Sequence, residues 1–234
     1  MNMARNKTSA IIILGGFLSQ APLYRDFSRQ LAEQTGKRVY VVNTRFLDWA
    51  ASITKTGWFL ALNKLDITVK KAARECAGQK LTLIGHSQGG ILGRLYLSHE
   101  PFLGKVFGGR DYIDHLITLG SPHLNLGGIQ RGGNMARWVQ QHVPDTIFAP
   151  QVRYTSVVGK YIHGRPSGSP TERFAFKVYK DIGEDGNVWG DGIVPVNSAL
   201  IPGSEQIILV GVSHHTVVGR PWYGSEEVIR SWWR

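Results

Sequence analysis

The sequence contains a single cysteine, Cys76, among its 234 residues. One thiol excludes an intrachain disulfide and any metal cluster built on several thiolates. Cys76 falls on the apolar face of a predicted helix, where cysteine serves as a small hydrophobic side chain. Nothing in this usage calls for an oxidising compartment, and we expect a cytoplasmic protein.

Long hydrophobic runs are also missing. The strongest apolar stretch, residues 10–18, is interrupted by Gly15 and Gly16. It is far shorter than the roughly 20 residues that cross a bilayer. Basic residues before it and small residues within it resemble a secretory signal. We favour a buried strand followed by a functional turn, because cleavage there would destroy both.

Acidic residues are fewer than basic ones. The chain has 17 Asp and Glu against 27 Lys and Arg, a formal net charge of +10. Such a balance attracts anionic surfaces, so weak association with an anionic membrane is one option. The basic residues are scattered and no RRM, KH or Cys/His zinc pattern is present, so we expect no nucleic-acid partner.

What the sequence does have is a regular alternation of short apolar runs and amphipathic stretches, without repeats. The run Ala10–Leu14 is continuously apolar, as expected for a strand buried on both faces of a parallel sheet. Ser19 is an N-cap candidate for the helix that follows, and Gly36 would end that helix. The predicted strands are residues 10–14, 38–44, 81–85, 115–120, 152–159 and 205–212, and the predicted helices are residues 21–37, 62–76, 89–100 and 224–234.

This order predicts an α/β fold with a mostly parallel central sheet flanked by helices. Residues 1–234 form one domain of ordinary size. Residues 124–151 are too long for a simple loop, and we interpret them as a cap or lid over the site. Residues 164–190 are predicted to be a second irregular stretch on the same rim. Functional groups are expected at the carboxyl ends of the strands.

The segment Gly85-His86-Ser87-Gln88-Gly89 lies between a predicted strand and a predicted helix. This is the setting of the G-x-S-x-G nucleophile elbow. A strand that turns at once into a helix strains the central residue and lifts its hydroxyl clear of the sheet, which leaves room only for glycine on either side. A chance match in a chain with 28 glycines is the alternative, and the strand–helix context argues against it.

A nucleophilic serine needs a base, and the base needs a carboxylate that holds its tautomer. Asp191 lies in a glycine-flanked turn, "WGDGIVP", and is our candidate acid, with an ordinary Asp-Gly turn as the alternative. His214 and His215 follow the last predicted strand, where a base facing the elbow is expected. His86 neighbours Ser87 on the turn and should point away from its hydroxyl.

The oxyanion of a tetrahedral intermediate needs two N–H donors. The amide of Gln88, directly after the nucleophile, is the first candidate. The second candidate is the amide of Phe17, in the turn "ILGGFLS" after the first strand. Glycines before Phe17 let the backbone approach the reacting carbonyl closely.

Together these pieces resemble the α/β-hydrolase superfamily of the lipase-like type, and more narrowly a cyanobacterial and plant branch of it. The matching segments are "ILGGFLS", "IGHSQGG", "TLGSPH", "NVWGDGIVP" and "GVSHH…RPWYGSEEVIRSWW". Related sequences read G-V-x-H-S near the end, which places the base on His214. One departure is Gly15, where many lipases carry histidine. We expect His123 of "GSPH" to lie near the entrance of the site and to have a structural role.

The sequence therefore predicts a serine hydrolase of carboxylic esters with the triad Ser87, Asp191 and His214. Trp138, Val139 and Val143 of the cap favour an apolar acyl group, as do aromatic residues of "FLDWAASITKTGWFL". For most of these residues, however, simple core packing is the better explanation. An acyltransferase or thioesterase would use the same triad, and a non-catalytic ligand-binding member of the fold is a further alternative. No metal, cofactor or nucleotide motif is present, and the expected partner is a small-molecule or lipid ester substrate.

Overall fold

The computed structural model describes residues 10–17, 19–45, 48–49, 54–125, 127 and 133–233. Six parallel strands form its main sheet in the order β2-β1-β3-β4-β5-β8. The predicted α/β class with a mostly parallel sheet is confirmed. The strands are β1 (Ala10–Leu14), β2 (Arg38–Val41), β3 (Leu81–His86), β4 (Ile113–Leu119), β5 (Arg153–Lys160) and β8 (Glu205–Val210).

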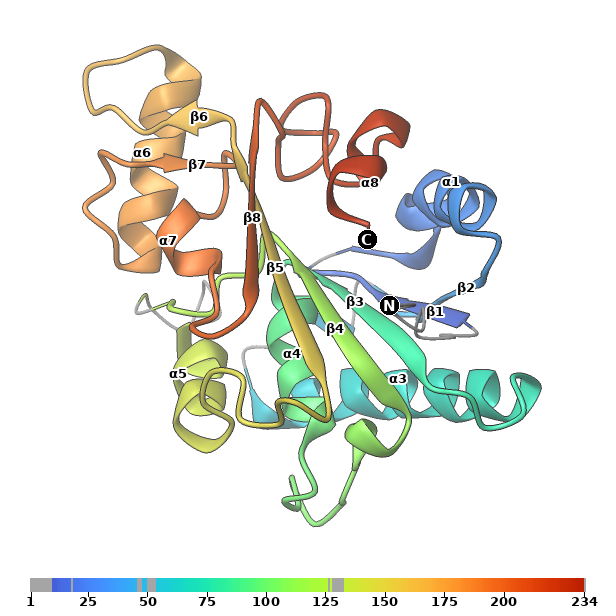
Figure 1. Cartoon of the computed structure of the whole chain (residues 1–234). Helices are drawn as coiled ribbons and strands as arrows, with labels where there is room; N and C mark the ends of the chain where they lie inside the picture. The colour runs from blue at the N-terminus through green and yellow to red at the C-terminus, as the bar shows by residue number, and fades with distance from the viewer. Residues whose placement is uncertain are drawn as a thin grey trace.

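Helices cover both faces of the sheet, which explains the continuous apolar run of β1 (Figure 1). Ile12 and Leu14 point into the core on one face, and Ile11 and Ile13 point into the core on the other. All four side chains are fully buried. The first face is covered by α3 (Lys55–Glu75), α4 (Gln88–Leu97) and α5 (Gly133–His142), and the second by α1 (Arg25–Thr35) and α8 (Glu226–Trp232).

The prediction of an irregular stretch at residues 164–190 was wrong. The helix α6 (Pro170–Ile182) occupies its centre. Ser169 and Glu172 form a capping box, in which Ser169 N donates to Glu172 Oε2 at 2.8 Å, and Gly183 ends the helix with φ +102°. The pattern Ser-Pro-x-Glu carries this start signal, because a capping serine and a proline at the first turn both favour a helix.

Three short elements complete this region. They are β6 (Ile162–His163) and β7 (Trp189–Gly190), which pair antiparallel, and α7 (Val196–Ala199). Figure 1 shows that they gather with α6 beside the ends of β5 and β8. Apolar side chains of α6, α7, β5 and the loop before α7 form a small separate core cluster. The loop that carries Asp191 leaves this lobe directly after β7.

The cap predicted at residues 124–151 falls partly outside the described residues, at 126 and 128–132. The rest of it contains α5, whose apolar side chains, including Val139, are buried against the same core as α4. Residues 133–142 of this segment therefore form a helix that belongs to the core. The lid function of this segment stays a prediction.

The turn after β1 differs from the expected one. A short 3-10 helix, η1 (Ala21–Tyr24), separates the turn from α1. Ser19 caps neither helix, because its hydroxyl donates to the carbonyl oxygen of Gly16 at 2.6 Å. The predicted N-cap role was wrong, and Ser19 instead shapes the turn.

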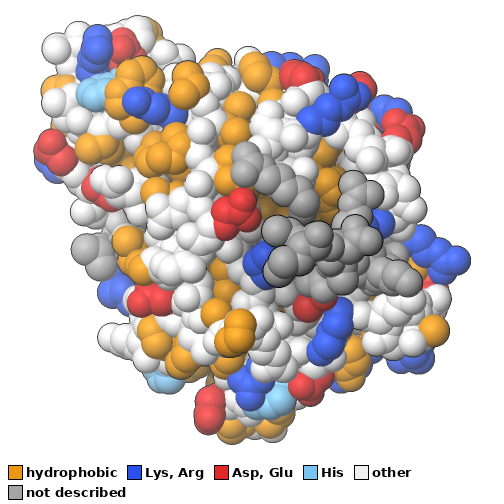
Figure 2. Space-filling model, in the orientation of Figure 1, with side chains coloured by type: hydrophobic (Ala, Val, Ile, Leu, Met, Phe, Trp, Pro, Cys, Tyr) orange, Lys and Arg blue, Asp and Glu red, His pale blue; other side chains and the backbone are white. Residues whose placement is uncertain are grey.

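The surface carries charges of both signs. On the face drawn in Figure 2, Lys and Arg side chains are interspersed with Asp and Glu. None of the helices within the described ranges combines the length and hydropathy that a membrane-crossing segment requires.

Candidate active site

Ser87 sits where β3 passes directly into α4. Its φ of +55° and ψ of −128° are values that a residue with a side chain rarely adopts. A Cβ on Gly85 would meet the backbone of α4, and one on Gly89 would meet the carbonyl oxygen of Leu14. The elbow therefore has the strained serine and the crowded flanks that its motif predicts. The amino end of α4 also directs its first N–H groups to the space beside Ser87.

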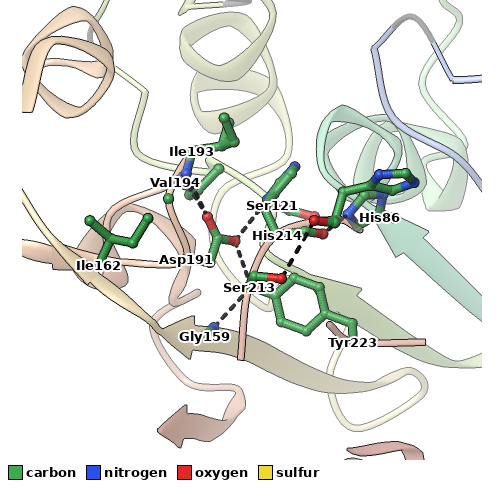
Figure 3. A network of polar contacts seen from close by, with 12 residues as sticks. His86, Ser121, Gly159, Ile162, Asp191, Ile193, Val194, Ser213, His214 and Tyr223 are labelled. Atoms are coloured by element: carbon green, nitrogen blue, oxygen red, sulfur yellow. Dashed lines mark hydrogen bonds and ion pairs between the residues drawn. The ribbon is translucent and has the colours of Figure 1, made fainter. Parts of the chain in front are cut away.

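Asp191 is fully buried, yet its carboxylate is fully hydrogen-bonded (Figure 3). Oδ1 accepts from the backbone N–H groups of Ile193 and Val194 at 3.0 and 2.7 Å. Oδ2 accepts from His214 Nδ1 at 2.7 Å and from the Tyr223 hydroxyl at 2.6 Å. Four donors and no acceptor surround this group, which fits the charged carboxylate.

His214 is the histidine that the structure brings to Asp191. Its backbone N–H also donates to the Asp191 carbonyl oxygen at 2.8 Å, so side chain and main chain are both tied to the acid loop. His215 turns the other way, and its Nδ1 lies 3.3 Å from Thr216 Oγ1. Burial, followed by the neighbouring His214, lowers the pKa of His215.

Ser87 and the acid–base pair meet around the turn after β4. The Ser87 N–H donates to the carbonyl oxygen of Leu119 at 2.9 Å. A Cβ on the next residue, Gly120, would press on both Asp191 and His214. Among the described residues, Ser87 Oγ has no hydrogen bond to the His214 ring. In unliganded hydrolases this contact is often long and shortens once substrate is bound.

The turn between β1 and η1 lies against the elbow. A Cβ on Gly16 would stand 2.5 Å from Ser87 Cβ and 3.1 Å from its Oγ. The Gly16 carbonyl oxygen is held by Ser19 N and Oγ. In a trans peptide the N–H lies in the same plane as the carbonyl group and points in the opposite direction, so the Phe17 N–H points away from Ser19. Of the two expected oxyanion donors, Gln88 follows Ser87 directly at the start of α4, and Phe17 follows Gly16, which lies against Ser87.

Sequence reasoning assigned no role to Tyr223, although its motif "WYGS" was part of the resemblance. This side chain is fully buried and accepts a hydrogen bond from Gly159 N at 2.9 Å while it donates to Asp191. Burial, followed by the charge of Asp191, raises the pKa of Tyr223 well above its usual value. Tyr223 is therefore a permanent donor to the acid. The Trp and Tyr of "WYGS", before the last helix, do not by themselves indicate a contact with Asp191.

The surroundings of His123 and the distribution of possible metal ligands can also be described. His123 is buried and lies 3.2 Å from Thr118 Oγ1 and 3.5 Å from Arg94, a packing position. Within the described part of the chain, no group of three or more His, Cys, Asp or Glu side chains is arranged to hold a metal ion.

Comparisons with known proteins agree with this geometry. A family model described as palmitoyl protein thioesterase matches residues 10–167, about two thirds of the chain. The match includes the elbow and the turn after β1, and it ends before the candidate acid and base. Among curated protein sequences, no significant match was found.

Several solved structures are similar to this chain at low sequence identity. A gene lin2722 product from Listeria innocua is 18% identical, with a TM-score of 0.56, over 97% of this chain and 93% of that chain. Est1E from Butyrivibrio proteoclasticus is 17% identical, with a TM-score of 0.48, over 91% and 82%. An alpha-beta serine hydrolase homologue from Coxiella burnetii is 14% identical, with a TM-score of 0.47, over 90% and 79%.

Proposed function

Because the chain belongs to the palmitoyl protein thioesterase family, we propose that it hydrolyses carboxylic esters of apolar acyl groups through an acyl-enzyme on Ser87. It is an α/β serine hydrolase, and esterases and thioesterases share its fold. The observation that carries the proposal is the buried Asp191–His214 pair, joined at 2.7 Å beside the strained elbow of Ser87.

The reaction follows from the roles of these groups. Ser87 Oγ attacks the acyl carbonyl carbon while His214 Nε2 takes the hydroxyl proton. The charge that develops on the carbonyl oxygen is met by the N–H groups of Phe17 and Gln88. His214 then protonates the departing alcohol or thiol, and the acyl group remains on Ser87. A water molecule then attacks the acyl-enzyme with the same proton transfers through His214, and the carboxylic acid product is released.

Asp191 orients His214 and stabilises the charged imidazolium that forms during each proton transfer. Its own four hydrogen bonds keep the carboxylate in one position, so the base needs no rearrangement during turnover. Tyr223 supplies the donor that is not part of the acid loop or the base.

An apolar substrate is supported by the rim of the site. Large apolar side chains are exposed directly after three strands that end at the same edge of the sheet: Phe17 after β1, Leu124 after β4 and Val217 after β8. Their exposed fractions are 38%, 40% and 90%. Exposed apolar residues at the edge of the sheet where Ser87 lies favour an apolar partner. Val139 of α5, which the sequence suggested as an acyl contact, is buried in the core instead.

A thioester is the second candidate substrate, and the family match favours it. Oxyesters and thioesters pass through the same acyl-enzyme, so the geometry fits both. A rate with an S-acyl thioester that exceeds the rate with the matching oxyester would assign the thioesterase activity. Transfer of the acyl group to an added alcohol or amine in preference to water would assign an acyltransferase.

The test is hydrolysis of a nitrophenyl ester series from acetate to palmitate by the purified protein, with labelling by a fluorophosphonate probe. We expect turnover that rises with chain length and covalent labelling of Ser87. Ser87→Ala should remove both, with a loss of turnover on the order of 10⁴-fold or more. A folded wild-type protein that neither labels nor hydrolyses any member of the series would be a ligand-binding protein instead.

The net charge of +10 supports one extension, association with an anionic membrane where acyl substrates reside. Sedimentation with vesicles containing phosphatidylserine, compared with phosphatidylcholine alone, measures it. Equal recovery on both vesicles would contradict an electrostatic association.

A further inference from the structure

A chain of buried hydrogen bonds runs behind the catalytic groups, from the oxyanion turn to the base. Gly16 N donates to Tyr24 Oη at 3.1 Å. Tyr24 Oη lies 2.7 Å from His86 Nδ1, and His86 Nε2 lies 3.0 Å from the carbonyl oxygen of His214. The contact between Tyr24 and His86 spans 62 positions, and that between His86 and His214 spans 128. These hydrogen bonds therefore connect four segments of the fold.

The backbone groups at the two ends of this hydrogen-bond chain limit which groups in it can donate and which can accept. A backbone N–H can only donate, so Tyr24 Oη accepts from Gly16 and uses its own proton toward His86 Nδ1. A backbone carbonyl can only accept, so His86 Nε2 must carry a proton and donate it to His214 O. A neutral His86 is therefore confined to one tautomer, with its proton on Nε2 and with Nδ1 accepting from Tyr24.

The surroundings of His86 support that state. The imidazole is buried, and its ring centroid lies 4.7 Å from that of His214. Burial, followed by the neighbouring His214 and His215, lowers the pKa of His86 well below its usual value. Burial likewise raises the pKa of Tyr24, so its hydroxyl keeps the proton it donates.

The two ends of this chain of hydrogen bonds are parts of the site whose relative positions must be fixed for catalysis. At one end, Gly16 precedes the Phe17 amide and lies against Ser87. At the other end, the His214 carbonyl belongs to the residue whose ring takes the proton of Ser87. Asp191 secures the ring and the N–H of His214, but not its carbonyl. Only His86 has a hydrogen bond to that carbonyl among the described residues.

We propose that Tyr24 and His86 are positioning residues that couple the oxyanion turn to the main chain of the base. The inference rests on the proposed function of Ser87 and His214. Tyr24 and His86 touch no reacting atom in this role. They set the distance between the oxyanion donor and the base, to which the rate of acyl transfer is sensitive.

Tyr24→Phe removes one hydroxyl and preserves the ring that packs against His86. We expect kcat for a nitrophenyl ester to fall roughly 10- to 100-fold with little change in KM, and labelling of Ser87 by the fluorophosphonate to slow equally. Tyr96→Phe is the matched control: it also removes a buried hydroxyl that is hydrogen-bonded, in this case to Asp66 at 3.2 Å, on the far side of α4. This control should retain kcat.

His86 can be split into its two contacts. His86→Gln keeps a donor near the position of Nε2 and loses the acceptor for Tyr24, whereas His86→Asn keeps the acceptor and loses the donor to His214. Both should lower kcat. Because Tyr24 and His86 act as one chain, Tyr24→Phe combined with His86→Gln should be no slower than the slower single variant.

The outcomes separate the two proposals. Wild-type protein without labelling or turnover would overturn the proposed function itself. Active wild type with Tyr24→Phe at full kcat, or single effects that multiply in the double variant, would overturn only the coupling. A melting temperature that falls while kcat stays constant would mean packing alone. If the His86 variants fail to fold, kcat of Tyr24→Phe against Tyr96→Phe decides.

Discussion

The Tyr223 hydroxyl lies 2.6 Å from Asp191 Oδ2, the same carboxylate oxygen that accepts from His214 Nδ1 at 2.7 Å. Asp191 Oδ2 is therefore hydrogen-bonded both to His214 and to Tyr223, an aromatic residue near the start of α8. Tyr223 in turn accepts from Gly159 at the end of β5. This arrangement places the acid between two donors that come from different parts of the fold.

Tyr223→Phe should weaken the hold on the acid without removing it. We expect kcat to fall about 10-fold, because the carboxylate keeps three of its four donors and can rotate. The free energy of unfolding should drop by about 1–3 kcal/mol, since the buried N–H of Gly159 loses its partner. Steady-state kinetics and urea denaturation measure the two effects. Unchanged kcat would show that Asp191 does not need this donor.

Asp191→Asn should be far more damaging than Tyr223→Phe. An amide nitrogen facing His214 Nδ1 would favour the wrong tautomer of the base, and the expected loss in kcat is about 10⁴-fold. Residual activity above that of Ser87→Ala should remain, because the oxyanion donors survive. Should Asp191→Asn be silent while Asp181→Ala or Asp185→Ala is not, the acid has been assigned to the wrong residue.

The two adjacent histidines should behave differently. His214→Ala is expected to abolish turnover, since His214 is bonded to Asp191, whereas His215→Ala should retain most of it because its ring turns toward Thr216. Turnover and fluorophosphonate labelling of both variants test the assignment. Loss of activity only in His215→Ala would move the base to that residue.

Buried neutral histidines predict a loss of stability in acid. Burial lowers the pKa of His115 to about 3, and also lowers the pKa values of His86 and His123 well below the ordinary 6.5. Below about pH 6.5 the unfolded chain binds protons that the native chain cannot, so stability falls as pH decreases. Each such histidine contributes up to about 1.4 kcal/mol per pH unit between its folded pKa and pH 6.5.

Urea denaturation at pH 7.5 and 5.5 measures this dependence. His115→Gln removes one titrating group on β4 and should reduce the change in the free energy of unfolding between these two pH values by about 1.4 kcal/mol in total. His142→Gln, at an exposed position on α5, is the matched control substitution. A free energy of unfolding that is constant over this pH range would contradict the assignment of buried neutral histidines.

Local patterns predicted most of the sheet. The apolar run of β1 predicts its strand correctly because both faces of that strand are covered. The elbow is predicted correctly because strand, serine and helix are consecutive in the chain. The lobe around α6 was missed although Ser169 and Glu172 carry its start signal. That helix follows a glycine-rich stretch. Glycines favour a loop, and this pattern obscured the helix start signal of the capping pair.

The sequence by itself determined the class of fold, the position of the elbow and the candidates for acid and base, because each depends on neighbours within a few residues. Only the tertiary structure decided which histidine meets Asp191 and which aromatic side chain supports it. Tyr24, His86 and Tyr223 bond partners between 32 and 128 positions away, apart from the link from Gly16 to Tyr24. Such contacts leave no periodicity in the sequence, since they depend on how strands and loops pack in space.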